Sequence, residues 1–186
     1  MIWFFTPYSF KKKMFDAWDQ YMNLVQNPED WVCLMDGDVA FLLSDFGHQM
    51  QDYIDKYPDT GLFTCYASRT SRPYLRWGKA DMENPSLVYH GNKAKQIYNA
   101  HHGEVIDLAD DNPLGYLMLI KKSTWLIIRD QLIEWTSNKR ILGVDTRISV
   151  AVRKAGFKTY LMKGMYVMHY YRMNNGVHDT SILTKK

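Results

Sequence analysis

Two carboxylates interrupt one of the most apolar parts of the chain. In the stretch WVCLMDGDVAFL, residues 31–42, an apolar run leads into Asp36-Gly37-Asp38, after which the chain turns apolar again. If the run before Asp36 is a parallel strand, both carboxylates lie at its carboxyl end, where open α/β sheets bind ligands. Two carboxylates around a glycine that permits a tight turn suit a hard divalent cation, which commonly serves a phosphate or diphosphate. The alternative is a polar turn with two solvated aspartates.

A histidine far downstream is a candidate third ligand. His169 follows the apolar run Tyr166-Val167-Met168, which we expect to be a strand that ends at the same edge of the sheet. A histidine among aromatic residues is also frequently a hydrogen-bonded core residue, so the sequence leaves both interpretations open.

The strands and helices expected around these side chains begin at the N-terminus. Ile2 to Phe5 is a short apolar run, and Ser9 can cap the segment that follows it. From Phe10 to Val25 the apolar residues recur at steps of three and four, which predicts an amphipathic helix. With a second strand at Trp31 to Met35, these elements predict a β-α-β unit with parallel strands and a right-handed crossover.

Further elements follow the same alternation of strands and helices. We expect helices at Phe46–Tyr57, Ser123–Trp135 and from Gly143 through Arg153, the last ended by Gly156, and strands at Gly61–Tyr66, Tyr116–Ile120, Lys158–Met162 and Met165–Tyr170. Residues 67–112 have little apolar periodicity, apart from a short helix near Lys93–His101, and such a long irregular segment is typical of a lid or binding loop. The sequence therefore predicts one α/β domain over residues 1–172 and a C-terminal tail over residues 173–186.

Composition narrows the classes of protein. The chain has 186 residues, a hydrophobic fraction of 46% and a net charge of +3, with its Lys and Arg residues scattered, so a nucleic-acid partner is not expected. Cys33 and Cys65 lie in apolar runs without zinc-type spacing, which predicts buried free thiols in a reducing compartment. Since no apolar run approaches the roughly 20 residues of a membrane span, we expect a cytoplasmic protein, with peripheral attachment to a membrane as an alternative.

Four motifs in order resemble the compact GT-A glycosyltransferases grouped in glycosyltransferase family 2. They are CLMDGDVAF around Asp36 and Asp38, NPLGYLMLIKKSTW at residues 112–125, LGVDTRISVAVRKAGFK around Asp145, and VMHYYR around His169. The resemblance covers roughly residues 2–172 and implies a GT-A fold, with a mostly parallel central sheet flanked by helices. Only about thirty residues separate Thr6 from Asp36, less than in the family, so the N-terminal nucleotide-binding part is expected to be reduced.

The resemblance also implies an activity and a role for each site residue. It implies transfer of a sugar, with inversion, from a nucleotide-diphosphate sugar such as a UDP-sugar to a hydroxyl of a glycan or glycolipid. Mn²⁺ or Mg²⁺ would be bound by Asp38 directly, by Asp36 through water or with a contact to the ribose, and by His169. Asp145 would be the catalytic base in a single in-line displacement. The remaining implied contacts are Thr6 and Tyr8 beside the nucleotide and Arg69 and Arg172 on the diphosphate.

Two other functions remain open from the sequence. A phosphatase of the haloacid dehalogenase type also has an Asp-x-Asp after a strand, with the first aspartate as nucleophile, but normally on its first strand rather than after a β-α unit. The second alternative is a GT-A-like domain that binds carbohydrate or protein and is catalytically inactive, which the shortened N-terminal part makes worth testing.

Overall fold

The computed structural model describes residues 1–9, 13–78, 80–136, 143–170, 173–174 and 177–178. Its strands are β1 (Ile2–Phe5), β2 (Trp31–Met35), β3 (Val39–Phe41), β4 (Thr60–Ala67), β5 (Val105–Asp107), β6 (Leu117–Lys121), β7 (Lys158–His169), β8 (Met173–Asn174) and β9 (Val177–His178). Its helices are α1 (Met14–Leu24), α2 (Phe46–Lys56), α3 (Leu87–His101), α4 (Lys122–Thr136) and α5 (Val144–Lys154), with short 3-10 helices η1 (Pro73–Leu75) and η2 (Ala80–Glu83).

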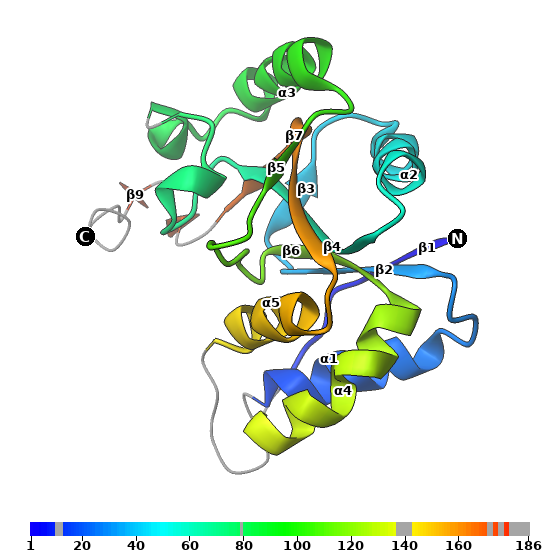
Figure 1. Ribbon diagram of the computed structural model, residues 1–186. Coiled ribbons are helices and arrows are strands. Elements are labelled where there is room, and N and C mark those ends of the chain that lie inside the picture. The colour runs from blue at the N-terminus through cyan, green and yellow to red at the C-terminus, as the bar shows by residue number, and fades with distance from the viewer. Residues whose placement is uncertain (10–12, 79, 137–142, 171–172, 175–176, 179–186) are drawn as a thin grey trace. The chain divides into compact units, whose positions relative to one another are not determined.

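The architecture of the described residues is α/β, as predicted, with a mixed seven-stranded sheet and flanking helices (Figure 1). The strand order is β1-β2-β6-β4-β7-β3, and β5 pairs with β7. The chain divides into two compact units. Unit 1 comprises residues 1–37, 57–64 and 107–160, and unit 2 comprises residues 38–56, 65–106 and 161–186.

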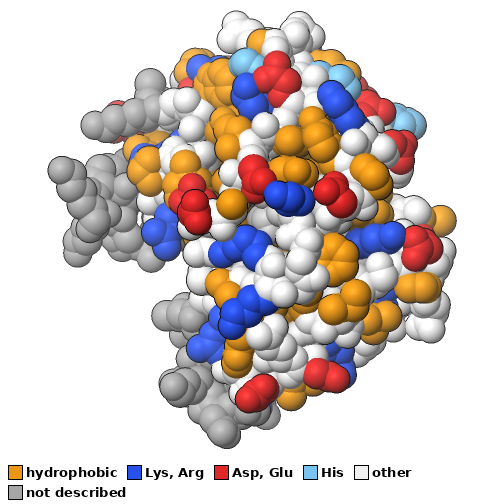
Figure 2. Space-filling model, in the orientation of Figure 1, with side chains coloured by type: hydrophobic (Ala, Val, Ile, Leu, Met, Phe, Trp, Pro, Cys, Tyr) orange, Lys and Arg blue, Asp and Glu red, His pale blue; other side chains and the backbone are white. Residues whose placement is uncertain are grey.

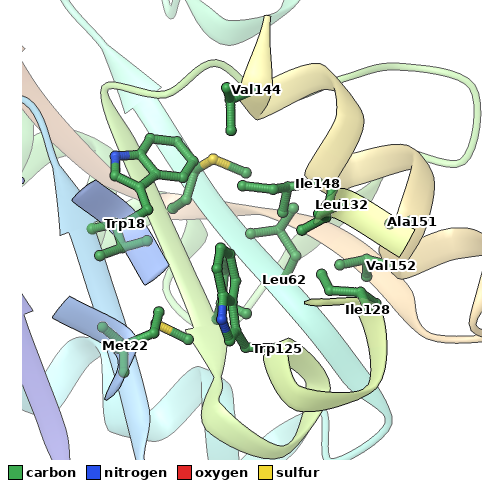
Figure 3. Packing of buried hydrophobic residues seen from close by; sticks show 14 of the residues in the cluster. Trp18, Met22, Leu62, Trp125, Ile128, Leu132, Val144, Ile148, Ala151 and Val152 are labelled. Carbon is green, nitrogen blue, oxygen red and sulfur yellow. The ribbon is translucent and has the colours of Figure 1, made fainter. Parts of the chain in front are cut away.

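Unit 1 contains the predicted β-α-β unit. β1 and β2 pair in parallel, from Ile2 opposite Trp31 to Phe5 opposite Leu34, and α1 connects them. Helices α1, α4 and α5 lie together on one side of β2 and β6 (Figure 1). Between them is an apolar core that includes Trp18, Met22, Leu62, Trp125, Ile148 and Val152, all buried (Figure 3). This core holds β2 and β6 in place, and Asp36 directly follows the carboxyl end of β2.

The expectation of a mostly parallel sheet is wrong. β1 and β2 form a parallel ladder, whereas β6 runs antiparallel to both β2 and β4, and β3 runs antiparallel to β7. The family resemblance implied such a sheet, and parallel pairing would need a crossover helix between successive strands. Between β4 and β6 the chain instead contains η1, η2, α3 and β5, and so long a connection allows the next strand to enter the sheet from either end.

Unit 2 contains most of the segment that the sequence pattern left irregular. This segment includes α3, which begins at Leu87 and is longer than the predicted helix because Ser86 caps it, its hydroxyl accepting the Tyr89 N–H at 3.2 Å. The same unit contains β3, a three-residue strand that pairs antiparallel with β7 from Val39 opposite His169 to Phe41 opposite Val167. The predicted lid or binding loop is therefore partly regular structure.

The two short strands expected between Lys158 and Tyr170 are a single strand, β7. Gly164 lies between the two expected strands and serves a close approach within unit 2. A Cβ placed there would lie 2.7 Å from the His102 Cα and 2.8 Å from the Tyr53 Oη. The Gly164 N–H donates to the same Tyr53 oxygen at 2.8 Å. Glycine is thus required by packing rather than by a turn, and the strand continues through it.

Helix α5 ends as its sequence predicts. Gly156 has a φ of +86°, and its N–H donates to the Arg153 carbonyl while the Phe157 N–H donates to the Val152 carbonyl. This pair of bonds is a Schellman motif, which favours glycine at the left-handed position. In the expected tail, β8 and β9 form a two-residue antiparallel ladder.

Two further predictions from composition can be compared with the structure. Cys33 and Cys65 are both buried, as expected, and burial raises the pKa of the Cys33 thiol. Among the described helices, none combines the length and the apolar character needed to cross a bilayer. On the face drawn in Figure 2, acidic and basic side chains are both spread over the surface.

Candidate metal centre

Asp38 and His169 are brought together by the pairing of β3 with β7 in unit 2. Val39 lies opposite His169, and the backbone continues the ladder by one bond, from the Tyr170 N–H to the Asp38 carbonyl at 2.9 Å. The His169 Nε2 consequently lies 3.3 Å from the Asp38 Oδ1. The side chain of His169 is 5% exposed and that of Asp38 is 45% exposed, so a buried imidazole faces a carboxylate that solvent can reach.

The orientation of the His169 ring determines which nitrogen faces the carboxylate. Its Nδ1 lies 2.8 Å from the backbone carbonyl oxygen of Arg69. Because a carbonyl oxygen can only accept, Nδ1 must carry a proton, and in the neutral ring Nε2 then presents a lone pair. A lone pair and a carboxylate oxygen 3.3 Å apart repel unless a positive species joins them. That species is either a proton on Nε2, giving an imidazolium–carboxylate pair, or a metal ion.

A backbone carbonyl behind the imidazole is also a common arrangement around metal-bound histidines. The hydrogen bond from the distal ring nitrogen fixes the tautomer and orients the other nitrogen toward the ion. Two ligand atoms that bind one ion at about 2.0–2.2 Å and at right angles are about 3 Å apart. The observed spacing between His169 and Asp38 therefore needs little adjustment to fit a shared ion.

Asp36 adds a second carboxylate to this pair. It precedes Asp38 by two residues in the same turn, so the chain itself limits how far its carboxylate can lie from that of Asp38. Carboxylate oxygens suit Mg²⁺ and Mn²⁺, and imidazole suits first-row transition metals. The mixed set fits Mn²⁺ better than Mg²⁺.

The electrostatic state of Asp38 agrees with a site for positive charge. In the imidazolium form of the pair, the hydrogen bond from His169 and its Coulomb attraction outweigh partial burial and lower the pKa of Asp38 below its ordinary value. The carboxylate is therefore ionised at neutral pH, as a metal ligand must be.

Asp145 lies in unit 1, in the first turn of α5. The helix is capped by Gly143, with a φ of +96°, rather than by Asp145. The Asp145 Oδ1 accepts the Thr146 N–H at 2.8 Å and Oδ2 accepts the Gly115 N–H at 3.0 Å. These bonds favour a negative charge at a helix N-terminus. They are also a structural reason for an aspartate here, because they tie the loop before β6 to α5.

The same loop connects Asp145 to Asp36. Tyr116, the residue after Gly115, accepts the Asp36 N–H at 3.0 Å through its carbonyl oxygen. Both aspartates are part of unit 1, and so the expected base and one expected metal ligand are attached to neighbouring residues of one loop. Thr6 belongs to this region too, since a Cβ added at Gly37 would lie 3.3 Å from its Cγ2.

The other residues expected to contact the donor lie in different settings. Tyr8 is 76% exposed, open to a stacking ligand. Arg69 is 1% exposed, and its Nη1 donates to the Met82 carbonyl at 2.7 Å, so its guanidinium lies inside unit 2. Arg172 lies outside the described residues. The roles proposed for these three side chains stay predictions.

Sequence reasoning missed two features that build this centre. One is β3, whose three residues are too few for a periodic pattern, although the return to apolar residues after Asp38 was its signal. The other is the carbonyl of Arg69, because a backbone acceptor leaves no trace in residue type. Comparison of the chain with protein-family models, with curated proteins and with solved structures found no match.

Proposed function

We propose that this chain is a metal-dependent glycosyltransferase that transfers a sugar from a nucleotide-diphosphate sugar to an acceptor hydroxyl, with inversion. The observation that carries the proposal is the contact of Asp38 with the lone-pair nitrogen of His169, next to the carboxylate of Asp36. A carboxylate pair and an imidazole that converge in this way suit a divalent cation, and carboxylate-bound cations are a common means of binding diphosphates.

Asp36, Asp38 and His169 would hold Mn²⁺ or, less favourably, Mg²⁺. When bound, the ion would neutralise charge that develops on the leaving diphosphate. The buried His169 contributes a ligand of fixed orientation, and the exposed carboxylates leave the site open to a ligand from solvent. Thr6 and Tyr8 complete the proposed donor contacts on the nucleotide. We leave Arg69 out of the diphosphate contacts because its guanidinium is buried against Met82.

Asp145 is the proposed general base. A carboxylate has about four acceptor positions, and the N–H groups of Gly115 and Thr146 occupy two of them. These bonds hold the side chain in place and leave it able to take the proton of an acceptor hydroxyl. The oxygen of that hydroxyl then attacks the anomeric carbon as the bond to the diphosphate breaks, which inverts the configuration.

The donor and acceptor classes are those that the resemblance to GT-A glycosyltransferases implies. A UDP-sugar is the proposed donor, and the acceptor is a glycan or a glycolipid. A glycolipid acceptor would bring a cytoplasmic enzyme to a membrane surface.

The proposal is tested by the release of nucleoside diphosphate from a panel of sugar nucleotides. The purified chain is incubated with each donor and a mixture of simple saccharide acceptors, with Mn²⁺ or with a chelator. We expect release from at least one donor with Mn²⁺, its loss in the chelator, and its loss in Asp38→Asn. No release from any donor, together with metal-dependent binding, would instead support the inactive binding domain. A phosphoenzyme trapped on Asp36 would support the phosphatase.

A further inference from the structure

Helix α5 holds one loop of unit 1 at two points. This loop, called the clamped loop, precedes β6 and runs from Asp111 to Gly115. At the end near β6, the Asp145 Oδ2 accepts the Gly115 N–H at 3.0 Å. At the other end, the Arg153 Nη1 donates to the Asp111 carbonyl at 2.9 Å, and its Nη2 donates to the Asn112 Oδ1 at 2.8 Å. The loop is therefore held between a carboxylate and a guanidinium of the same helix.

The two attachments leave the clamped loop little freedom. Asn112 and Gly115 are three residues apart, and so short a segment has few conformations when both of its ends are fixed. Between them lies Pro113, which is buried and whose ring holds φ near about −65°. A shift at the arginine end would therefore be passed on to the Gly115 N–H.

Arginine suits its end of the clamp better than lysine would. Its planar guanidinium holds several donors in a fixed fork and so can bond two adjacent residues at once, which a single ammonium does less well. A more ordinary reason for a basic residue is the C-terminus of α5, because Arg153 and Lys154 both lie in its last turn. The Lys154 Nζ, however, lies 5.1 Å from the centroid of the Trp135 ring. A change at Lys154 therefore removes charge from the helix end and leaves the clamp in place.

The other end of the clamp is the proposed general base. Asp145 accepts the Thr146 N–H on Oδ1 and the Gly115 N–H on Oδ2. The first bond comes from the next residue of the same helix, whereas the second comes from the clamped loop and fixes the other oxygen. Release of Gly115 would leave the carboxylate free to turn about its side-chain bonds.

We infer that Arg153 is a positioning residue for Asp145, because its grip on Asp111 and Asn112 keeps the Gly115 N–H on the Asp145 Oδ2. This inference rests on the proposed function, in which Asp145 is the general base. Arg153 touches neither donor nor acceptor in this account and acts through the clamped loop. A displacement of about 1 Å in a catalytic group can cost on the order of 10²-fold in rate.

The experiment follows hydrogen exchange of the Gly115 amide by NMR and, separately, steady-state transfer kinetics. The test variants are Arg153→Met, which keeps an unbranched side chain and removes both donors, and Arg153→Lys, which restores the charge but not the fork. Lys154→Met is the matched control. The Arg147 amide, which bonds the Gly143 carbonyl at 3.2 Å, reports on the first turn of α5 in the same spectra.

We expect Arg153→Met to speed exchange at Gly115 by about tenfold, because the loop opens more often. The same variant should lower kcat by about 10–100-fold and keep the KM for the donor within about twofold. Arg153→Lys should lie between Arg153→Met and the unmodified chain. Lys154→Met should leave both measurements within about twofold, and exchange at Arg147 should be unchanged in all three variants, because the helix itself stays folded.

Exchange at Gly115 within about twofold of the unmodified chain in Arg153→Met would overturn the inference. Faster exchange with an unchanged kcat, or an equal loss in Lys154→Met, would overturn it too, since Arg153 would then order the loop or the helix end without positioning the base. If Arg153→Met does not fold, Arg153→Lys decides the question alone. An unmodified chain that transfers no sugar would overturn the proposed function and the catalytic role of the clamp, while exchange at Gly115 would still show whether Arg153 holds the loop, which distinguishes the two failures.

Discussion

The Nε2 of His169 lies 3.3 Å from the Oδ1 of Asp38, although the two residues are far apart in the sequence. Two backbone interactions produce this contact. The ladder between β3 and β7 brings the residues opposite one another, and the Arg69 carbonyl turns the imidazole so that Nε2 faces the carboxylate. Because the geometry is set by backbone atoms, a change of either side chain should affect ion binding more than folding.

Replacing His169 with Ala should weaken Mn²⁺ binding by about tenfold or more and Mg²⁺ binding by less. The physical reason is that the variant loses a nitrogen ligand, which Mn²⁺ accepts more readily than Mg²⁺ does. Calorimetric titration of both ions measures this change in preference. His48→Ala is the control, because His48 is an exposed histidine of α2. Equal losses for the two ions would show that His169 acts on the site without being a ligand.

Asp145→Asn should leave a folded chain that binds donor but transfers sugar on the order of 10²–10⁴ times more slowly. The amide can still accept one backbone N–H, so the stability loss should be about 1 kcal/mol, from the bond to Gly115 or Thr146 that it no longer accepts. Rates of nucleotide release with acceptor present measure the effect. Asp130→Asn, at a side chain that is 94% exposed, controls for loss of charge.

A rate within tenfold of the unmodified chain would assign Asp145 a structural role only. In that case its contacts with Gly115 and Thr146 explain the residue fully, and Asp110 or Asp111, on the loop before Gly115, becomes the next candidate for the base.

Much of the local structure could be predicted from the sequence, because its signals are local. The spacing of Phe15, Trp18 and Met22 predicts α1, and Gly156 predicts the end of α5. What could not be predicted depends on contacts between distant residues. The antiparallel entry of β6 follows from the whole path after β4, and the continuity of β7 through Gly164 follows from the approach of Tyr53 and His102.

In the candidate site, too, the local signals could be read from the sequence and the contacts between distant residues could not. The order of Asp36, Asp38 and His169 after apolar runs was enough to expect a shared site, and within unit 2 the His169 Nε2 lies 3.3 Å from the Asp38 Oδ1. The sequence left open whether His169 is a core residue or a metal ligand. In the structure it is both buried and directed at Asp38. Its tautomer depends on a backbone carbonyl, and residue types contain no information about that acceptor.

Asp19→Asn should destabilise the chain by about 1–2 kcal/mol at pH 7, and this difference should shrink in acid. The Arg129 guanidinium donates to both Asp19 oxygens, at 2.7 and 2.8 Å, and its hydrogen bond is the largest effect that lowers the pKa of Asp19. A carboxyl whose pKa is lowered by folding stabilises the fold above its unfolded pKa, near 3.9, and loses that contribution as the pH falls through its folded pKa.

Urea unfolding of the Asp19→Asn variant and the unmodified chain at pH 7 and at successive values below pH 4 measures this change. A difference in unfolding free energy that stays constant over the whole range would contradict the ion pair as its source, because protonation of Asp19 should abolish it.

Gly164→Ala should destabilise the chain by about 1–3 kcal/mol. The new methyl group would lie 2.7 Å from the His102 Cα and 2.9 Å from the His101 carbonyl, and backbone atoms cannot move aside as a flexible side chain can. Gly91→Ala is the opposite control, because a Cβ there meets nothing within 4 Å and the position is inside α3. That change should stabilise by about 0.5–1 kcal/mol. Thermal unfolding that ranks the two variants the other way would refute the close approach.

Calorimetric titration of UDP into the chain, with Mn²⁺ and with a chelator, tests whether a metal ion joins the donor to the protein. Because the ion is proposed to join the diphosphate to Asp36, Asp38 and His169, we predict measurable binding with Mn²⁺ and an affinity at least about tenfold lower without it. Asp38→Asn should reduce the affinity in Mn²⁺ to the metal-free value while its unfolding midpoint stays close to that of the unmodified chain. Equal affinity with and without Mn²⁺, or no binding of UDP in either condition, would show that no metal ion joins the diphosphate to this site.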